Sequence, residues 1–183
     1  MDSPNRTAFA KFASRRSVVH STKGVVTSTQ PLASECGLSI LRKGGNCADA
    51  AVAIAAGLNV TEPGSTGIGG DMFCLFYEAA TKRVHSLNGS GRSGEQADLL
   101  RIRAELGYSE GQQAKIGVDS VHAVTVPGAA AGWVDCVSRF GSQNVNMAEI
   151  LAPAIELAER GFPVSEISAY NVSLSKHFHG VFR

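Results

Sequence analysis

The sequence carries almost no net charge. Its 17 lysine and arginine residues nearly balance 16 aspartate and glutamate residues, and the formal charge at pH 7 is +1. Attraction to nucleic acid or to an anionic membrane through bulk electrostatics requires a clear excess of basic residues. The composition therefore argues against a nucleic-acid partner and against a membrane partner.

A long hydrophobic run is also missing. No segment reaches the ~18 consecutive apolar residues that a membrane-spanning helix needs. Residues 1–17 lack the uninterrupted apolar core of a signal peptide. We predict a cytoplasmic protein in which residues 1–21 form a disordered polar leader and residues 22–183 form the folded part.

Residues that bind metals are few and scattered. The chain has four cysteines: Cys36, Cys47, Cys74 and Cys136. They form no Cys-x-x-Cys pair, and no cysteine and histidine residues share the spacing of zinc ligands. His177 and His179 form a weak His-x-His pair near the end of the chain. We predict neither a metal ion nor another cofactor.

Two common catalytic signatures are absent as well. No Gly-x-Ser-x-Gly motif marks a serine hydrolase. The glycine-rich segment 63–70 lacks the Gly-Lys-Ser/Thr ending of a phosphate-binding loop, and it precedes strands rather than a helix. Two interpretations of this segment stay open. Its glycines allow tight backbone packing, or the segment lines a pocket beside a substrate.

The sequence does contain alternating signals for helices and strands. Apolar and branched residues predict strands at 24–28, 72–77, 83–88 and 120–126. Helical periodicity and end signals predict helices at 31–43, 46–58, 98–106, 129–140 and 147–160. This mixed order is typical of a layered α/β or α+β domain.

The helix predicted at 46–58 has a clear beginning and an unusual surface. Asn46 is a good N-cap and Asp49 falls three residues later, while Gly44 and Gly45 end the preceding helix. The helix is apolar nearly all round, which predicts a buried position. We also expect the strands at 72–77 and 83–88 to form a substantially buried hairpin.

Arg92 is the candidate binding residue. It ends the segment Asn88-Gly-Ser-Gly-Arg92, which directly follows a predicted strand. A guanidinium fixed at a strand end can bind both oxygens of a carboxylate in parallel. The alternative interpretation is a surface turn with a solvated arginine, and the pattern alone leaves both open.

Four segments stand out in order along the chain. They are TSTQPLASECGLSILRKGGNCADAAVAIAAGLNVTEPGSTGIGGDMF, LNGSGRS, HAVTVPGAAAGWVD and ILAPAIELAERGFPVS. Together they resemble the N-terminal region of the γ-glutamyltransferases, also called γ-glutamyltranspeptidases or glutathione hydrolases. The resemblance covers about residues 22–170, and it makes residues 22–183 a partial large-subunit domain.

This resemblance implies an N-terminal-nucleophile hydrolase with an αββα sandwich, of which the chain carries an incomplete portion. Such enzymes are made as one precursor that cuts itself into a large and a small subunit. The new N-terminal threonine of the small subunit attacks the γ-glutamyl amide of glutathione, with its own amine as base. The glutamyl group then passes through an acyl-enzyme to water or to an amino-acid or peptide acceptor.

The resemblance gives Arg92 the role of binding the α-carboxylate of the γ-glutamyl group. In more typical members an acidic residue follows this arginine, whereas Ser93 follows it here, which leaves the subfamily and the substrate range open. A same-fold acylase is therefore one alternative function. A non-catalytic truncated module is another.

The resemblance also implies that no catalytic residue lies in this chain. The nucleophilic threonine belongs to a Thr-Thr-His type segment, and the sequence contains none. We therefore expect the chain to be inactive alone and to need the missing small-subunit segment of the same precursor. A truncated gene product, an incomplete gene model and a split protein all fit. Without that segment, we expect residues 47–58 and 72–77 to face water.

Overall fold

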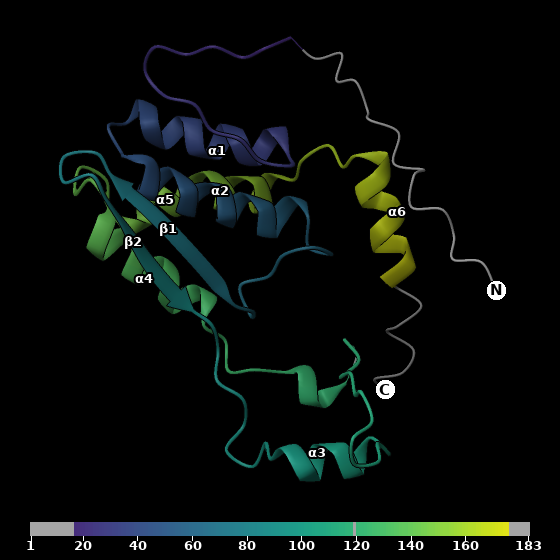
Figure 1. The fold of residues 1–183 in the computed structure, drawn as a ribbon. Helices are drawn as coiled ribbons and strands as arrows, with labels where there is room; N and C mark the ends of the chain where they lie inside the picture. Colours follow the sequence, from purple (N-terminus) through teal and green to yellow (C-terminus); the bar gives the residue numbers. More distant parts are fainter. Residues whose placement is uncertain (1–16, 119, 176–183) are drawn as a thin grey trace.

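The computed structural model describes residues 17–118 and 120–175, with side chains as far as residue 170. Most of the predicted leader and the His177/His179 pair lie outside the described residues. The elements are α1 (Pro31–Arg42), α2 (Cys47–Thr61), β1 (Met72–Glu78), β2 (Arg83–Gly89), α3 (Leu99–Glu105), the 3-10 helix η2 (Val121–Ala123), α4 (Ala129–Phe140), α5 (Met147–Arg160) and α6 (Glu166–Ser175). Figure 1 shows their arrangement.

The connection between α1 and α2 follows the predicted pattern. Gly44 has a φ of 93°, a left-handed conformation that glycine adopts without strain. The Asn46 side chain accepts hydrogen bonds from the backbone N–H groups of Ala48 and Asp49. The Asp49 carboxylate in turn accepts from the Asn46 N–H at 2.9 Å. This reciprocal capping box fixes the start of α2.

Helix α2 is the centre of the packed core. It contacts α1, α5 and α4, and its buried residues are Ala48, Asp49, Ala50, Val52, Ala53, Ala56, Gly57 and Thr61. The expectation that residues 47–58 would face water is wrong. Helices α1 and α5, both within this chain, cover α2, as Figure 1 shows. The all-round apolar surface of α2 fits this enclosed position.

The hairpin packs on α4 through one face only. Strands β1 and β2 are antiparallel, with Met72 opposite Gly89 and Glu78 opposite Arg83. On the inner face, the Phe76 ring stacks on that of Phe140 in α4, with centroids 4.9 Å apart. On the outer face, Phe73 is 71% exposed and Leu75 is 79% exposed. The prediction of a substantially buried hairpin is therefore wrong for the outer face, because no described residue covers it.

Two predicted strands are absent from the described residues. Residues 24–28 and 120–126 are not paired with any strand, and part of the second forms η2. The Ser120 hydroxyl accepts from the His122 N–H at 3.2 Å and caps this short helix. Alternating branched residues favour a strand only where a partner supplies the ladder of hydrogen bonds. Helix α6 was not predicted, because its residues lack a clear start or stop signal.

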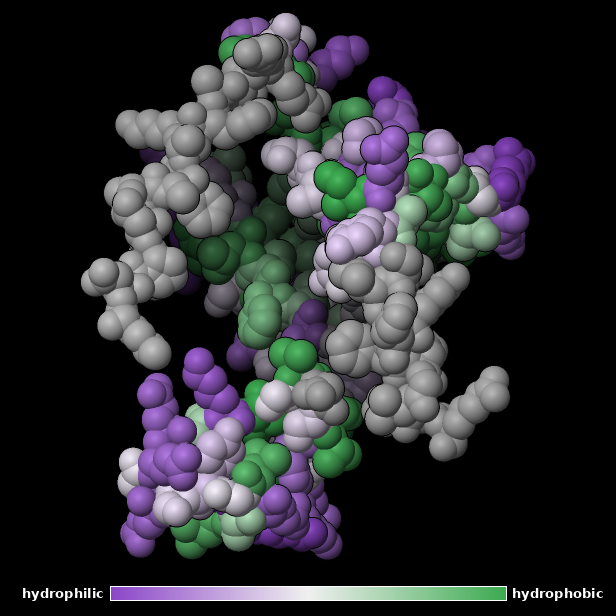
Figure 2. Space-filling view, turned by 90° about the vertical axis from the view of Figure 1, so that its right-hand side faces the viewer, coloured by the Kyte–Doolittle hydropathy of each residue, from purple (hydrophilic) through white to green (hydrophobic). Residues whose placement is uncertain are grey.

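The segment that carries α3 extends away from the packed helices (Figure 1). None of the residues of α3 is buried, although the Asp98 side chain accepts hydrogen bonds from the N–H groups of Leu100 and Arg101 and caps the helix. Figure 2 shows this segment below the main body, with hydrophobic residues on both sides of the hollow between them. Val121, Val124 and Val126, which follow α3 in the chain, are all exposed.

Candidate functional site

Three segments far apart in sequence meet at one end of the hairpin. They are the end of the glycine-rich segment at Gly70 and Asp71, residues 88–92, and residues 125–128. We call residues 88–92 the Arg92 loop. The Gly70 carbonyl accepts hydrogen bonds from the N–H groups of Gly128, at 3.1 Å, and Ala129, at 2.9 Å. This contact joins the start of β1 to the start of α4.

Hydrogen bonds hold the Arg92 loop on two sides. Asp71 Oδ1 accepts from the Gly91 N–H at 2.6 Å and from the Thr125 hydroxyl at 3.3 Å. The Arg92 carbonyl accepts from the Val126 N–H at 2.8 Å. The course of the backbone before and at Arg92 is therefore fixed by Asp71, directly before β1, and by residues 125–126.

Close backbone approach explains the glycines in these segments. A Cβ atom at Gly91 would collide with the Val126 carbonyl oxygen and lie 2.8 Å from the Thr125 hydroxyl oxygen. A Cβ atom at Gly128 would collide with the Gly89 carbonyl oxygen. Real Cβ atoms do not approach oxygen so closely, so both positions require glycine for reasons of space.

The backbone of Arg92 is held by hydrogen bonds, whereas its side chain has no partner among the described residues. The residue is exposed, and its guanidinium makes no hydrogen bond or ion pair with any residue that the structure describes. It lies outside the four cavities described below. The structure thus places the predicted binding residue at a strand end, as expected, and leaves its role a prediction.

The glycine-rich segment borders a cavity of about 350 Å³. Ser65, Thr66, Gly67, Gly70 and Asp71 line it on one side. The other side consists of α2, Met72 and the first turns of α4: Ala55, Leu58, Asn59, Met72, Ala129 and Trp133. Residues 65–67 and Gly70 of the glycine-rich segment thus line a cavity, and the interpretation that a substrate lies beside them stays a prediction. Asp71 belongs both to this cavity and to the support of the Arg92 loop.

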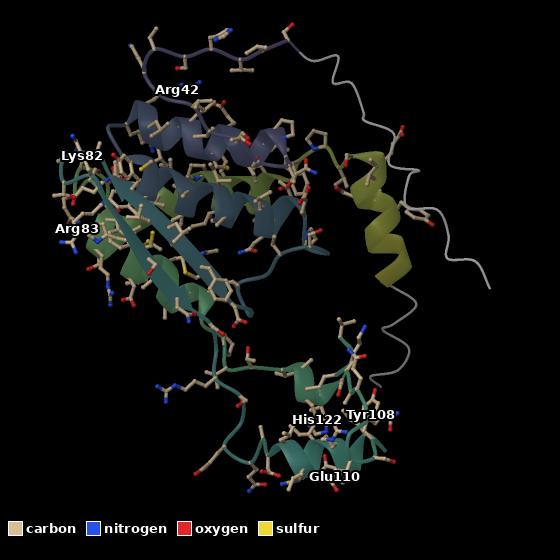
Figure 3. The ribbon with its side chains drawn as sticks, viewed as in Figure 1. Arg42, Lys82, Arg83, Tyr108, Glu110 and His122 are labelled. Carbon is tan, nitrogen blue, oxygen red and sulfur yellow. The ribbon has the colours of Figure 1, made fainter. Side chains whose placement is uncertain are left out.

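A second cavity, of about 470 Å³, begins where the Arg92 loop ends. Ser93 and Gly94 form part of its wall. Across it, Glu105 contacts Arg101 at 2.7 Å and His122 at 3.0 Å. The Arg101 hydrogen bond is the main cause that lowers the pKa of Glu105, with His122 contributing. Figure 3 shows His122 on the α3 segment, away from the packed helices.

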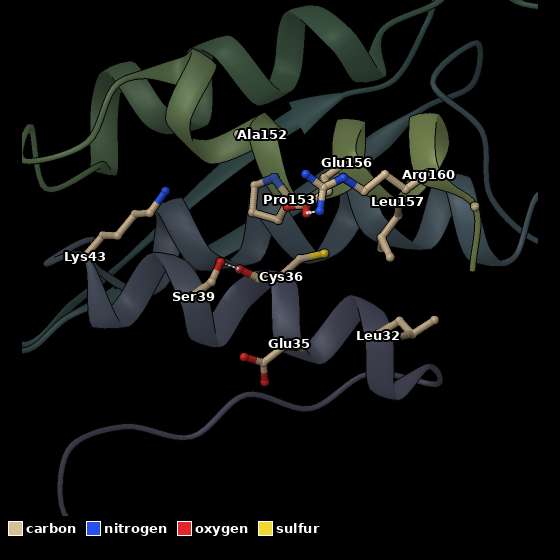
Figure 4. Close-up of a pocket in the computed structure, with 11 residues that line it drawn as sticks. Leu32, Glu35, Cys36, Ser39, Lys43, Ala152, Pro153, Glu156, Leu157 and Arg160 are labelled. Carbon is tan, nitrogen blue, oxygen red and sulfur yellow. Dashed lines mark hydrogen bonds and ion pairs between the residues drawn. The ribbon is translucent and has the colours of Figure 1, made fainter. Parts of the chain in front are cut away.

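The cavity between α1 and α5 lies elsewhere and lacks catalytic features. It has a volume of about 420 Å³, and Glu156 and Arg160 in its wall form an ion pair at 2.6 Å (Figure 4). Its only cysteine is Cys36, and burial raises the pKa of that thiol. A raised pKa disfavours the thiolate that nucleophilic attack requires. Another cavity, of about 340 Å³, lies between residues 29–31, 62–65 and 165–168.

The cysteines are all free, and two of them are neighbours. Cys74 in β1 and Cys136 in α4 have sulfur atoms 3.8 Å apart. Burial, with the neighbouring Cys74 as a second cause, raises the pKa of Cys136 to about 12. Among residues 17–118 and 120–175, no three His, Cys, Asp or Glu side chains gather as metal ligands.

Comparison with known proteins decides the family. The sequence model of the γ-glutamyltranspeptidases matches residues 33–179. The chain belongs to the γ-glutamyltranspeptidase family. It is 42% identical over 146 residues to a glutathione hydrolase-like YwrD proenzyme of Bacillus subtilis, a match covering 79% of this chain and 26% of the relative. The chain thus spans about a quarter of the length of the curated relatives that it matches.

Solved structures of family members confirm the predicted fold class. The γ-glutamyltranspeptidase of Helicobacter pylori superposes with a TM-score of 0.76 at 29% identity, covering 88% of this chain and 44% of that one. A cephalosporin acylase from Bacillus halodurans gives a TM-score of 0.71 at 34% identity, covering 94% and 32%. The described residues thus form part of an N-terminal-nucleophile hydrolase domain. None of the described helices has the length and apolar character to cross a membrane.

Asp71 is the site residue that sequence reasoning missed. An acid directly after a glycine-rich segment has no distinctive spacing, so nothing linked it to Arg92. The hairpin register provides the link. Because Met72 pairs with Gly89, Asp71 comes to lie beside the residues that follow β2.

Proposed function

We propose that this chain supplies the carboxylate-binding part of an enzyme that cleaves the γ-glutamyl amide of glutathione. The glutamyl group would pass to water or to an amino-acid or peptide acceptor. The observation that carries the proposal is Arg92: its backbone is held by Asp71 and Val126, and its guanidinium has no partner among the residues that the structure describes. An anchored, unpaired arginine is suited to bidentate binding of a carboxylate.

The catalytic nucleophile would come from a different polypeptide segment. The names of the relatives describe proenzymes, and no Thr-Thr-His sequence occurs among the 183 residues. We therefore expect no amide hydrolysis from the chain alone. A complementing small-subunit segment would provide the threonine and also a cover for the outer face of the hairpin.

That outer face supports the need for a partner. Phe73, Leu75, Tyr77 and Val84 are all more than half exposed on one side of the two-stranded sheet. A sheet is stable in a layered domain when both faces that carry apolar residues are covered. Further strands or a second layer, contributed by the complementing segment, would complete the sandwich.

The test is complementation with a small-subunit segment, followed by hydrolysis of a γ-glutamyl chromogenic amide. Arg92→Ala should raise KM by about tenfold to a hundredfold, because a charge-assisted bidentate contact is worth about 1.5–3 kcal/mol. The KM of Arg92→Lys should lie between those of the wild type and Arg92→Ala, since lysine keeps the charge and lacks the planar guanidinium. Arg139→Ala, on the exposed surface of α4, is the matched control and should change nothing. An unchanged KM in Arg92→Ala would refute the proposal.

A same-fold acylase is the second candidate, because the chain is 34% identical to a cephalosporin acylase over a well-superposed region. Glutaryl and γ-glutamyl amides separate the two functions. Both carry a terminal carboxylate, and only the γ-glutamyl group has an amine beside it. Faster turnover of the glutaryl amide by the complemented enzyme would favour the acylase.

A further inference from the structure

Asp71 is the only carboxylate, among the residues that the structure describes, that hydrogen-bonds to the Arg92 loop. It lies 20 residues before Gly91 in sequence and approaches it because the hairpin returns β2 to the start of β1. A single oxygen, Oδ1, accepts from both the Gly91 N–H and the Thr125 hydroxyl. One side chain thus joins the Arg92 loop to residues 125–128.

The contacts of Asp71 are to the backbone before Arg92 and not to the guanidinium. Within the described part of the chain, Asp71 forms no ion pair with any arginine or lysine. It therefore leaves the positive charge of Arg92 free for a ligand. The Val126 N–H holds the Arg92 carbonyl at 2.8 Å from the opposite side. Together these two contacts fix the direction in which the Arg92 side chain leaves the main chain.

We propose that Asp71 is a positioning residue for Arg92. It sets the direction of the guanidinium, and thereby its alignment with the carboxylate of the substrate. This inference rests on the proposed role of Arg92 as the carboxylate receptor. Arginine is long, so a small rotation of its backbone displaces the guanidinium by a large distance. Binding groups lose much of their effect when they are misplaced by about 1 Å.

The fit around Gly91 strengthens the inference. Gly91 packs so closely on Thr125 and Val126 that the position has no room for a side chain. This close packing restricts the Arg92 loop to one conformation while the Asp71 carboxylate accepts a hydrogen bond from the Gly91 N–H. Without the carboxylate, the Gly91 N–H loses its acceptor and the loop can move away from residues 125–126, because Gly89 and Gly91 restrict the backbone little.

The first experiment uses the chain assembled with the complementing segment and measures kcat and KM separately. Asp71→Ala should raise KM for the γ-glutamyl amide about tenfold, with a much smaller change in kcat, because the lost alignment affects the carboxylate and not the scissile bond. Asp71→Asn keeps a carbonyl oxygen as acceptor and should restore most of the affinity. Asp135→Ala, an exposed carboxylate on α4, is the matched control and should leave KM unchanged.

A double-mutant cycle separates positioning from a general effect on folding. If Asp71 acts through Arg92, Asp71→Ala should add nothing, within about twofold, to the loss already caused by Arg92→Ala. Additive losses would overturn the inference. If Arg92→Ala leaves KM unchanged, the proposed function fails. If only Arg92→Ala has an effect and Asp71→Ala has none, the positioning role fails and the proposed function stands.

A second measurement does not depend on activity. Hydrogen exchange at the Gly91 and Val126 amides should be about tenfold faster in Asp71→Ala, while amides of α1 and α2 keep their rates. Asp71→Asn should restore slow exchange at both amides. Equal exchange at these two amides in wild type and in Asp71→Ala would overturn the inference, whatever the kinetics show.

Discussion

The outer face of the hairpin should determine how the chain associates. Covering a Phe or Leu side chain fully is worth about 1.5–3 kcal/mol, and Phe73 and Leu75 are 71% and 79% exposed. A partner that covers both would therefore gain about 2–4 kcal/mol from these two residues. Leu75→Glu places a charge in the middle of this face and should remove most of that gain.

The expected result has two parts. Leu75→Glu should weaken binding of the complementing segment by about thirtyfold or more, the equivalent of about 2 kcal/mol. It should also reduce self-association of the isolated chain, because an exposed apolar sheet invites aggregation. Titration with the complementing segment measures the first effect, and sedimentation velocity measures the second.

A matched change on another surface is the control for this experiment. Val134 lies on α4 and is 54% exposed, so Val134→Glu adds the same charge away from the outer face. It should affect neither measurement. If the Leu75→Glu variant binds the complementing segment as tightly as the wild type does, the outer face is not the docking surface.

Three further predictions concern stability and reactivity. Asp49→Ala should lower the free energy of unfolding in urea by about 2–4 kcal/mol, because the buried Asp49 carboxylate accepts hydrogen bonds from two backbone N–H groups. Glu149→Ala, in the exposed capping box of α5, is the control and should lower it by only about 0.5–1 kcal/mol. Alkylation followed by mass spectrometry should label the exposed Cys47 far faster than the buried Cys136 at pH 8. The labelling rate of Cys136 should keep rising toward pH 12, because its raised pKa means that the thiolate forms only at high pH. Equal labelling rates of the two cysteines at pH 8 would contradict this prediction. Gly128→Ala should lower the thermal midpoint by the equivalent of about 2 kcal/mol or more, through its collision with the Gly89 carbonyl; an unchanged midpoint would show that the backbone can move apart.

The sequence predicted well what depends on neighbours along the chain. The capping of α2 by Asn46 and Asp49 and the left-handed glycine at 44 are local features, and the structure has both. Their physical cause lies within a few residues, so pattern reading reaches them. The strand-end location of Arg92 was predictable for the same reason.

What failed depended on contacts between distant segments. Residues 24–28 and 120–126 have the composition of strands, and the described residues offer them no strand partner. The surroundings of α2 were mispredicted because its cover, α1 and α5, cannot be read from α2 itself. Asp71 was missed because its role depends on the register of the hairpin and on residues 125–126, which follow about 50 residues later.

The one-sided packing of the hairpin also bears on the order of assembly. Contacts such as the stacked rings of Phe76 and Phe140 fix β1 and β2 against α4. The backbone groups along both edges of this small sheet are therefore already aligned before another strand arrives. A strand added to this sheet would have to alternate its side chains between the two faces in the register that β1 and β2 already have. The hairpin would then act as a template, and completing the sheet would be an addition to a finished surface rather than a joint folding of both parts.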